Sequence, residues 1–364
     1  MVETTPVVLV TGLSDDAMAS TTLSLQWDLP HAVVLRHTLD VGTQRLTRLV
    51  SDMTGVVEHV HHDLDHACVS CALREDIVPT IERLAASRRW GAVIVHLPTA
   101  AEAHQVCRVT ALDPHAAPHA RITAVLTAVD AADVRADLLG DELLRERGAH
   151  TSEGDARGVG EVLCSMVEHA DAVVVSGALD EPEHDLLRAL MRPDSLLVPD
   201  PSRLDGPRFS GPLHDHDRTE RWIDAVRRGS VPVPRSEHVW MLDLRSERAL
   251  HPDRLLGSIE SIGGGPRRSR GCFWLPTRPT SVNAWDGAGG QLSVGVHGAW
   301  GPGRRPLTRL VVHGLTADGD GADAVRETFQ ECLVSEREQS RRGRFWDVGE
   351  DGFEPWLGPV RHVA

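Results

Sequence analysis

The sequence predicts an α/β fold in which a parallel sheet carries helices on both faces and is followed by a smaller α+β domain. Up to about residue 200, short apolar runs rich in β-branched residues alternate with segments of helical periodicity. These runs are continuously apolar, which is typical of strands buried on both faces of a parallel sheet. Beyond residue 236 the strand-like segments follow one another with few helices between them, which favours an antiparallel sheet.

Several predicted strands of the first region are apolar runs, such as 6–11 and 91–97. The helix expected over 72–86 places Leu73, Ile77 and Ile81 on one face. Pro79 inside it would bend the helix or mark a late start. We expect strands at residues 6–11, 32–36, 54–61, 91–97, 122–129, 171–176 and 195–198, and helices at 19–27, 72–86, 101–112, 158–169 and 183–191.

The 364 residues accommodate two domains at roughly 150 residues each. We expect the first domain over 1–200, a Pro- and Gly-rich linker with one helix (219–228) over 201–236, and the second domain over 237–364. Six of the nine Trp lie in the second domain, where we expect them mainly to fill the core. Its expected strands are 238–244, 272–276, 282–285, 291–296 and 307–313, and its expected helices are 253–262 and 322–335.

The basic residues restrict the chemistry that this chain can perform. All 38 are Arg, because the sequence contains no lysine, and it contains no tyrosine either. A Schiff-base mechanism and a Walker A loop both depend on a lysine, so neither is possible in its usual form. A GC-rich coding bias is the plainer explanation of the missing lysines, but the chemical restriction holds whatever its cause.

The formal net charge of −15 opposes broad binding to nucleic acids or to anionic membranes. A nucleic-acid partner would have to be reached through a local Arg patch or through another protein. The sequence has no run of 18 apolar residues and no basic-then-apolar start, so we expect a cytoplasmic protein without a membrane span. The six Cys are then expected to be thiols or metal ligands and not disulfides.

The segment 11–26 has the layout of a phosphate-binding loop, with a strand that ends at Gly12 and Thr21-Thr22 at the expected start of a helix. Ser20 stands where a lysine would be needed, and Asp15 and Asp16 would repel a triphosphate. Thr21 or Thr22 retains the hydroxyl that would coordinate Mg²⁺. Two interpretations stay open here: a strand-to-helix turn without a ligand, and weak or altered nucleotide binding.

The segment 58–77 concentrates His, Asp and Cys residues. Cys68 and Cys71 form a Cys-x-x-Cys pair, which can place two thiolates on one Zn²⁺, and the nearest additional ligands are His66 and Asp65. A redox role of the two cysteines is a competing interpretation. A packed loop with two inert thiols is the third.

These residues resemble the CobW-type P-loop GTPases, a family of metal chaperones. The resemblance rests on the opening strand with Thr-Gly and Thr-Thr-Leu, on the segment CVSCALREDI at 68–77, and on the region 271–300, which resembles the CobW C-terminal domain. It implies a P-loop NTPase-like sheet followed by a CobW C-terminal domain, with zinc at the cysteines. Asp180 resembles the last residue of the base-reading Asn-Lys-x-Asp motif of this family.

The chain departs from the family pattern at four places that concern nucleotide and metal chemistry. Ser20 replaces the P-loop lysine, Ser70 replaces the middle Cys, His96 replaces the acidic switch residue, and Ala178 replaces the lysine of the base-reading motif. We therefore expect only vestigial nucleotide binding, at Gly12, Ser20, Thr21, Thr22 and Asp180. We do not expect GTP and Mg²⁺ to be firmly bound cofactors, and we expect little or no GTPase activity.

Within the family, the chain resembles most the actinobacterial, mainly mycobacterial, branch of zinc-responsive factors that recruit a protein Y-type hibernation factor to ribosomes. This resemblance implies a zinc-linked adaptor whose partners are the ribosome and that factor. The alternatives are an ordinary CobW-type zinc metallochaperone GTPase and a zinc sensor that works without nucleotide.

Overall fold

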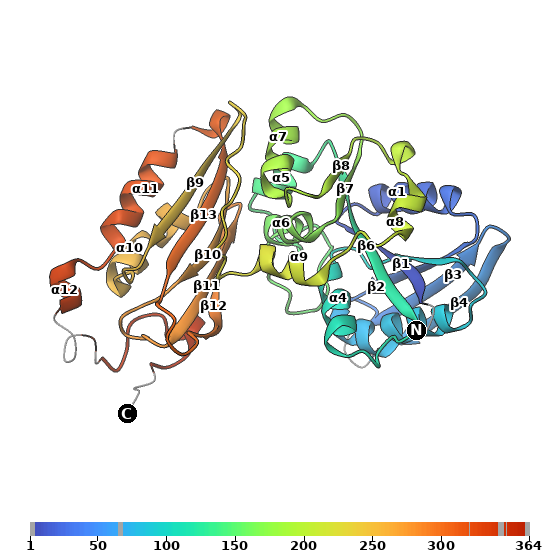
Figure 1. Cartoon of the computed structure of the whole chain (residues 1–364), viewed down its shortest axis with the longest axis horizontal. Helices are drawn as coiled ribbons and strands as arrows, with labels where there is room; N and C mark the ends of the chain where they lie inside the picture. Colours follow the sequence, from blue (N-terminus) through green and yellow to red (C-terminus); the bar gives the residue numbers. More distant parts are fainter. Residues whose placement is uncertain (1–3, 65–67, 320, 341–345, 347, 361–364) are drawn as a thin grey trace. The chain divides into compact units, whose positions relative to one another are not determined.

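The chain forms two compact units (Figure 1). The first comprises residues up to 137, 142–180 and 190–223, and the second comprises 138–141, 181–189 and the residues from 224 onward. The computed structural model describes residues 4–64, 68–319, 321–340, 346 and 348–360.

The first unit is built on an eight-stranded sheet with the strand order β4-β3-β2-β5-β1-β6-β7-β8. The central strands pair in parallel, which confirms the predicted α/β fold. They are β1 (Thr5–Gly12), β2 (Ala32–Asp40), β5 (Ala92–His96), β6 (Ala120–Asp130), β7 (Ala172–Ser176) and β8 (Leu196–Val198).

One edge of this sheet is antiparallel, because β3 (Arg45–Asp52) pairs in opposite direction with both β2 and β4 (Gly55–Asp63). The sequence predicted the fourth strand but not β3. Arg45 and Arg48 interrupt the apolar pattern of β3, which is why no continuous apolar run marks it. Charged residues of this hairpin contact the segment that follows the two cysteines.

Helices cover both faces of the sheet, and the two faces follow from the alternation of side chains along β1. Val7 and Leu9 pack in one core with the helices at 78–86 and 103–112. Val8 and Val10 pack in a second core with the helices at 15–28 and 206–210. The helices of this part of the chain are α1 (Asp15–Asp28), α3 (Val78–Ala86), α4 (Ala103–Leu112), α5 (Val134–Leu139), α6 (Val159–His169), α7 (Glu181–Leu190), α8 (Gly206–Ser210) and α9 (His216–Ile223).

The predicted helix over 72–86 is present but is not one regular helix. It begins as α2 (Val69–Ala72), continues as a π-helical turn (Leu73–Ile77) and ends as α3. The Val78 N–H donates to the carbonyl of Leu73, five residues earlier. Pro79 follows directly, and since proline has no N–H to donate, the wider turn accommodates it at the start of α3.

The region predicted as a linker is ordered over its first part. Residues 201–223 belong to the first unit and contain a 3₁₀ turn (Pro201–Arg203), α8 and α9. Phe209 of α8 is completely buried in the core beside α1, so this stretch contributes apolar packing despite its Pro and Gly content. The last of the crossings between the two units lies at residues 223–224, inside the stretch 201–236 that the sequence predicts as a linker.

The second unit contains a five-stranded antiparallel sheet in the order β12-β11-β10-β13-β9, as the sequence predicted for an α+β domain. Trp285, Phe273 and Phe329 are buried in its core, whereas Trp356 is half exposed. The elements are β9 (Val239–Ser246), α10 (Pro252–Gly263), β10 (Arg267–Phe273), β11 (Ser281–Ala288), β12 (Gln291–Ala299), β13 (Thr308–Leu315), a 3₁₀ turn (Thr316–Asp318), α11 (Gly321–Cys332), α12 (Glu336–Ser340) and α13 (Glu354–Leu357).

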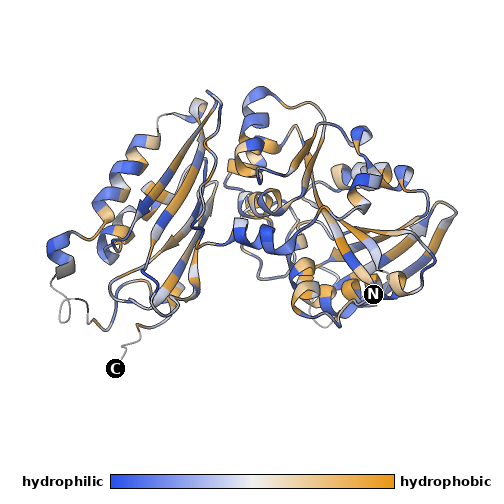
Figure 2. Cartoon of the chain, in the orientation of Figure 1, coloured by the Kyte–Doolittle hydropathy of each residue, from blue (hydrophilic) through white to orange (hydrophobic). Residues whose placement is uncertain are grey.

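Apolar residues are concentrated in the strands of both sheets, while α9 is almost entirely hydrophilic (Figure 2). Among the residues that the structure describes, no helix is both long enough and apolar enough to cross a bilayer.

Candidate functional site

The segment after β1 does not form an open loop. α1 begins at Asp15, directly after Leu13 and Ser14, so the expectation that the helix starts near Ala19 is wrong. Ser14 caps the helix: its side chain accepts from the Ala17 N–H at 3.3 Å, and its carbonyl accepts from the Met18 N–H at 3.0 Å. The N–H groups of Ala17 and Met18 are thus used within the helix and are not free to bind a ligand.

Gly12, predicted as part of a nucleotide site, is required here by packing. A Cβ atom at this position would lie 2.5 Å from the carbonyl oxygen of Ala128 on β6 and 3.0 Å from the Met18 side chain. The glycine therefore allows β1 to approach its neighbour closely. Its presence needs no phosphate ligand as an explanation.

Ser20, Thr21 and Thr22 lie in the second turn of α1. Ser20 is exposed, while Thr21 and Thr22 are buried. The Thr22 hydroxyl donates to the Met18 carbonyl at 2.8 Å and lies 3.0 Å from Nδ1 of His96. The Thr21 hydroxyl has no hydrogen-bond partner within the described part of the chain. Both hydroxyls consequently face protein atoms.

The start of α1 is negatively charged, and an arginine neutralises part of that charge. Nη2 of Arg36 on β2 lies 2.9 and 2.7 Å from the two carboxylate oxygens of Asp15. His96 ends β5 beside them, with Nε2 at 3.6 Å from Asp15. Burial, together with the charge of Arg36, lowers the pKa of His96 to about 4, so the ring is neutral at pH 7 and does not supply a missing cation.

Asp180, the remaining residue predicted for the nucleotide site, is exposed in the turn between β7 and α7. Gly177 in the same turn has a φ of +100°, which favours glycine at this position. The alanine that replaces the motif lysine, Ala178, is also exposed. This turn therefore presents a carboxylate without an accompanying cation of its own.

Cys68 and Cys71 lie at the two ends of the first turn of α2. Cys68 is the N-cap residue, and its sulfur accepts from the Cys71 N–H at 3.2 Å. The two Sγ atoms are 2.8 Å apart, and both residues are partly exposed. The hydrogen bond with Cys68 and burial raise the pKa of Cys71, so its thiol is protonated at neutral pH.

The two thiols fit a thiophilic metal ion in part. Two thiolates on one tetrahedral zinc are about 3.8 Å apart, given a Zn–S distance near 2.3 Å, so the pair has to open by about 1 Å. In the described ranges, no third His, Cys, Asp or Glu converges with these two on one point. Asp65 and His66, the other predicted ligands, lie outside the described residues.

Asp76 follows the two cysteines within the π-helical turn and connects that turn to three strands. Its carboxylate accepts from Nε2 of His37 on β2 at 2.7 Å and from Nη1 of Arg48 on β3 at 2.5 Å. Nε2 of His62 on β4 is 3.0 Å away, and the Thr80 hydroxyl donates at 3.3 Å. Asp76 is only 7% exposed. Although burial opposes it, the bond from His37 and the nearby Arg48 hold the pKa of Asp76 below its usual value.

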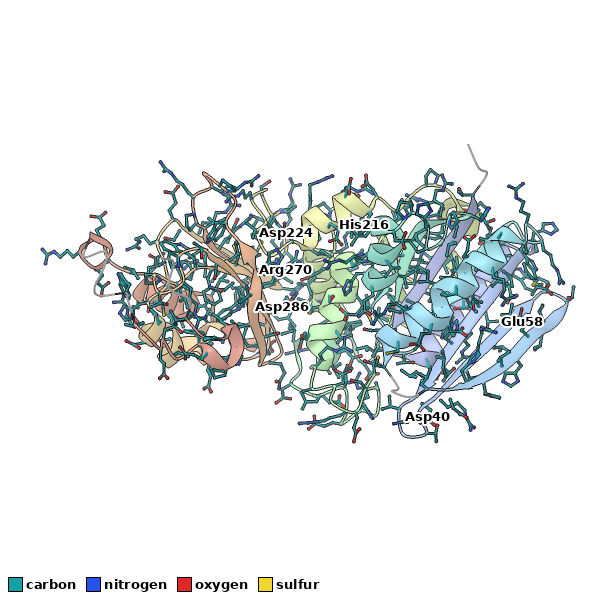
Figure 3. All side chains as sticks on the ribbon, turned by 90° about the horizontal axis from the view of Figure 1, so that it is seen from below. Asp40, Glu58, His216, Asp224, Arg270 and Asp286 are labelled. Atoms are coloured by element: carbon teal, nitrogen blue, oxygen red, sulfur yellow. The ribbon has the colours of Figure 1, made fainter. Side chains whose placement is uncertain are left out.

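A second ion-pair network supports the same region from the surface. Glu58 of β4 (Figure 3) accepts from both terminal nitrogens of Arg83 on α3 at 2.6 and 2.8 Å, and it lies 3.6 Å from Arg48.

The sequence pattern did not predict His37, Arg48 or the role of Asp76. The Leu-Arg-Glu-Asp motif at 73–76 marked the carboxylate, but its partners come from strands distant in sequence.

Comparisons with known protein families match two parts of the chain. Residues 32–189 match the CobW/HypB/UreG nucleotide-binding domain, and residues 239–333 match the cobalamin synthesis protein cobW C-terminal domain. The chain belongs to the CobW/HypB/UreG family. Its match to the family's nucleotide-binding domain begins after α1, so the segment that contains Gly12 and Thr21 lies outside the matched region.

Two named relatives are similar to this chain over most of its length. Zinc chaperone Rv0106 of Mycobacterium tuberculosis is 28% identical over 311 residues, which are 81% of this chain and 74% of the relative. Zinc-regulated GTPase metalloprotein activator 1 of Dictyostelium discoideum is 19% identical over 256 residues, which are 65% of this chain and 54% of the relative. The Zn(II)-bound YjiA GTPase from E. coli aligns over 91% of this chain and 99% of its own, but at 13% identity and a TM-score of 0.37, which is too low to support a structural argument.

Proposed function

We propose that this chain is a zinc-handling CobW-type protein in which Cys68 and Cys71 hold the metal and the nucleotide-binding domain acts as a scaffold without GTP hydrolysis. The observation that carries the proposal is the pair of thiols with Sγ atoms 2.8 Å apart on a segment that Asp76 anchors to the sheet. The names of two relatives, a zinc chaperone and a zinc-regulated activator, support zinc as the metal.

The chemistry of the donors suits zinc. Thiolates favour zinc and other soft or borderline ions over magnesium and calcium, which prefer oxygen ligands. Asp65 and His66 stand three and two positions before Cys68 in the sequence and are the proposed sources of further ligands. Because the thiol of Cys71 is protonated at neutral pH, zinc has to displace a proton to bind it.

The proposal that GTP is not hydrolysed rests on the start of α1. A helix that begins at Asp15, is capped by Ser14 and carries Asp15 and Asp16 in its first turn presents two carboxylates where phosphates would bind. The chain has no lysine to offset them. The chemistry of a P-loop enzyme depends on such a cation together with Mg²⁺.

Elemental analysis and native mass spectrometry of the purified full chain test both parts of this proposal. We expect zinc in the wild type, a loss of that zinc in the Cys68→Ser/Cys71→Ser variant, and no bound guanine nucleotide. Calorimetry with GTP and Mg²⁺ at millimolar concentration is expected to give no binding heat. GTP turnover well above background, lost in Thr21→Ala, would instead establish an ordinary CobW-type metallochaperone GTPase.

A finer proposal concerns the partners. We infer from the resemblance to the actinobacterial branch that the chain recruits a protein Y-type hibernation factor to ribosomes. The net charge of −15 favours a basic partner protein over direct contact with ribosomal RNA. A pull-down from cells grown in low zinc is expected to recover the factor and ribosomal proteins. Recovery of neither would contradict the adaptor role and leave zinc binding unaffected.

A zinc sensor that works without nucleotide is the remaining alternative. It requires two conformations with different zinc affinities. Zinc-dependent changes in hydrogen exchange outside residues 55–86 would support it, because a purely local metal site would protect only its own segment.

A further inference from the structure

Four histidines of the first unit lie side by side, far from the cysteines in sequence. His104 is on α4, His169 ends α6, His214 precedes α9, and His216 begins α9, where Figure 3 labels it. The ring centroids of His104 and His169 are 6.1 Å apart, those of His169 and His214 are 5.7 Å apart, and those of His214 and His216 are 6.4 Å apart. Nothing in the proposed function uses these rings.

Several nitrogen atoms in this histidine cluster are buried without a partner. Within the described residues, neither Nδ1 nor Nε2 of His169 makes a hydrogen bond, although His169 is only 2% exposed. Nε2 of His214 and Nδ1 of His216 are likewise buried and unbonded. A buried polar atom without a partner costs about 1–3 kcal/mol, so a row of them indicates a ligand that the nitrogens bind.

Asp171 holds His214 in the form that a metal ion requires. The Nδ1–H of His214 donates to Oδ2 of Asp171 at 2.8 Å, which leaves the lone pair on Nε2 available. Asp171 is itself fixed by Nη2 of Arg192 at 2.6 Å and by the Val125 N–H at 2.9 Å. A carboxylate that orients a histidine in this way is the usual second layer of a protein metal site.

Charged side chains of both signs surround the cluster. Asp171 and Glu102 are negative, and Oε1 of Glu102 lies 3.7 Å from Nδ1 of His104. Arg192 is positive and donates to the His169 carbonyl at 3.2 Å, while Arg157 pairs with Glu102 at 2.7 Å.

We propose that His169 and His214, with His104 as the third ligand, form a second metal site that takes a divalent transition ion favouring imidazole, such as Zn²⁺. Imidazoles on one tetrahedral ion have ring centroids about 5 Å apart when the metal–nitrogen distance is near 2.1 Å. The spacings of 6.1 Å (His104–His169) and 5.7 Å (His169–His214) therefore have to close by up to about 1 Å. The site shares no residue with the cysteine pair. It is also independent of whether the cysteines bind zinc.

Binding requires one adjustment of the side chains. No three potential ligands in the described part of the chain already point at one position, so at least one ring has to turn. His104 is suited to do so, because its side chain is 31% exposed and lines a crevice with Glu102, Ser165 and His169.

Co²⁺ titration of the full-length Cys68→Ser/Cys71→Ser variant tests the site by absorption. We expect the visible d–d bands of a four-coordinate ion, without the near-ultraviolet charge-transfer band that a thiolate ligand produces, at about one equivalent. His169→Gln and His104→Gln in this background are expected to weaken binding at least tenfold. His115→Gln, at an exposed position with no role in the cluster, serves as the matched control and is expected to bind like its parent.

Absence of the bands in the cysteine variant would overturn the proposal, as would equal affinities for the His104→Gln and His115→Gln variants. Circular dichroism of each variant reports whether it is folded. If His169→Gln does not fold because that residue is buried, the partly exposed His104 decides the outcome.

Discussion

Nε2 of His37 donates a hydrogen bond to Oδ1 of Asp76 across 2.7 Å, and this buried contact joins the turn after the two cysteines to a central strand of the sheet. Arg48 occupies the other carboxylate oxygen. The position of the cysteine segment on the sheet depends on this arrangement, since Asp76 lies only five positions after Cys71.

Asp76→Asn is expected to lower the free energy of unfolding by about 1–3 kcal/mol, because it weakens the bonds that the buried carboxylate accepts from His37 and Arg48 and leaves Arg48 with Glu58 as its remaining ionic partner. Urea denaturation at pH 7 measures the change. Glu75→Gln, at the exposed neighbouring position, is the matched control and should stay within about 0.5 kcal/mol of the wild type. Equal losses in the two variants would show that the Asp76 network does not stabilise the fold.

The stability of the protein is expected to depend on the titration of His96. Its pKa is about 4 in the folded chain and 6.5 ordinarily, so the unfolded chain binds more protons between these values. Folding stability therefore falls as the pH is lowered from 6.5 to 4, by up to about 1.4 kcal/mol per pH unit for this group. Denaturation across this range should give a smaller slope for His96→Gln than for the wild type. His115→Gln should keep the wild-type slope, and identical slopes for His96→Gln and the wild type would refute the prediction.

Thr21→Val tests whether the Thr21 hydroxyl retains a role. The hydroxyl is buried without a described partner, so replacing it with a methyl group of similar size is expected to leave the melting temperature unchanged or to raise it. Thr22→Val removes the bonds to Met18 and His96 and should cost about 1 kcal/mol. Millimolar GTP with Mg²⁺ is expected to change neither melting temperature. A GTP-dependent increase that Thr21→Val abolishes would restore a nucleotide role to this residue.

Zinc affinity at the cysteine pair is expected to decrease by at least about tenfold when the pH is lowered by one unit, because the metal displaces the proton of Cys71. Competition with a chromophoric chelator of known proton dependence measures the effect. Ser70→Ala, between the two cysteines, should retain the wild-type affinity and slope. An affinity that does not vary with pH would mean that thiolates are not the ligands.

The sequence by itself determined the general architecture. Continuous apolar runs such as 91–97 predicted buried parallel strands, because only strands covered on both faces can be apolar at every position. The absence of lysine restricted the chemistry independently of how the chain folds. The Leu-Arg-Glu-Asp segment indicated the family because its four residues are adjacent in the chain. Strand β3 was missed because its arginines interrupt the pattern that marks a buried strand.

Only the tertiary structure decided what the polar residues do. Gly12 suits a phosphate loop in sequence, yet the approach of Ala128 from β6 is what requires it. Arg36 pairs with Asp15, and Arg48 pairs with Asp76, from strands that lie many residues away in the chain.

The histidine cluster is a further case. His104, His169 and His214 are 65 and 45 positions apart in sequence and become neighbours through the packing of α4, α6 and α9. Such pairings depend on which faces of distant elements meet, and local periodicity carries no information about that.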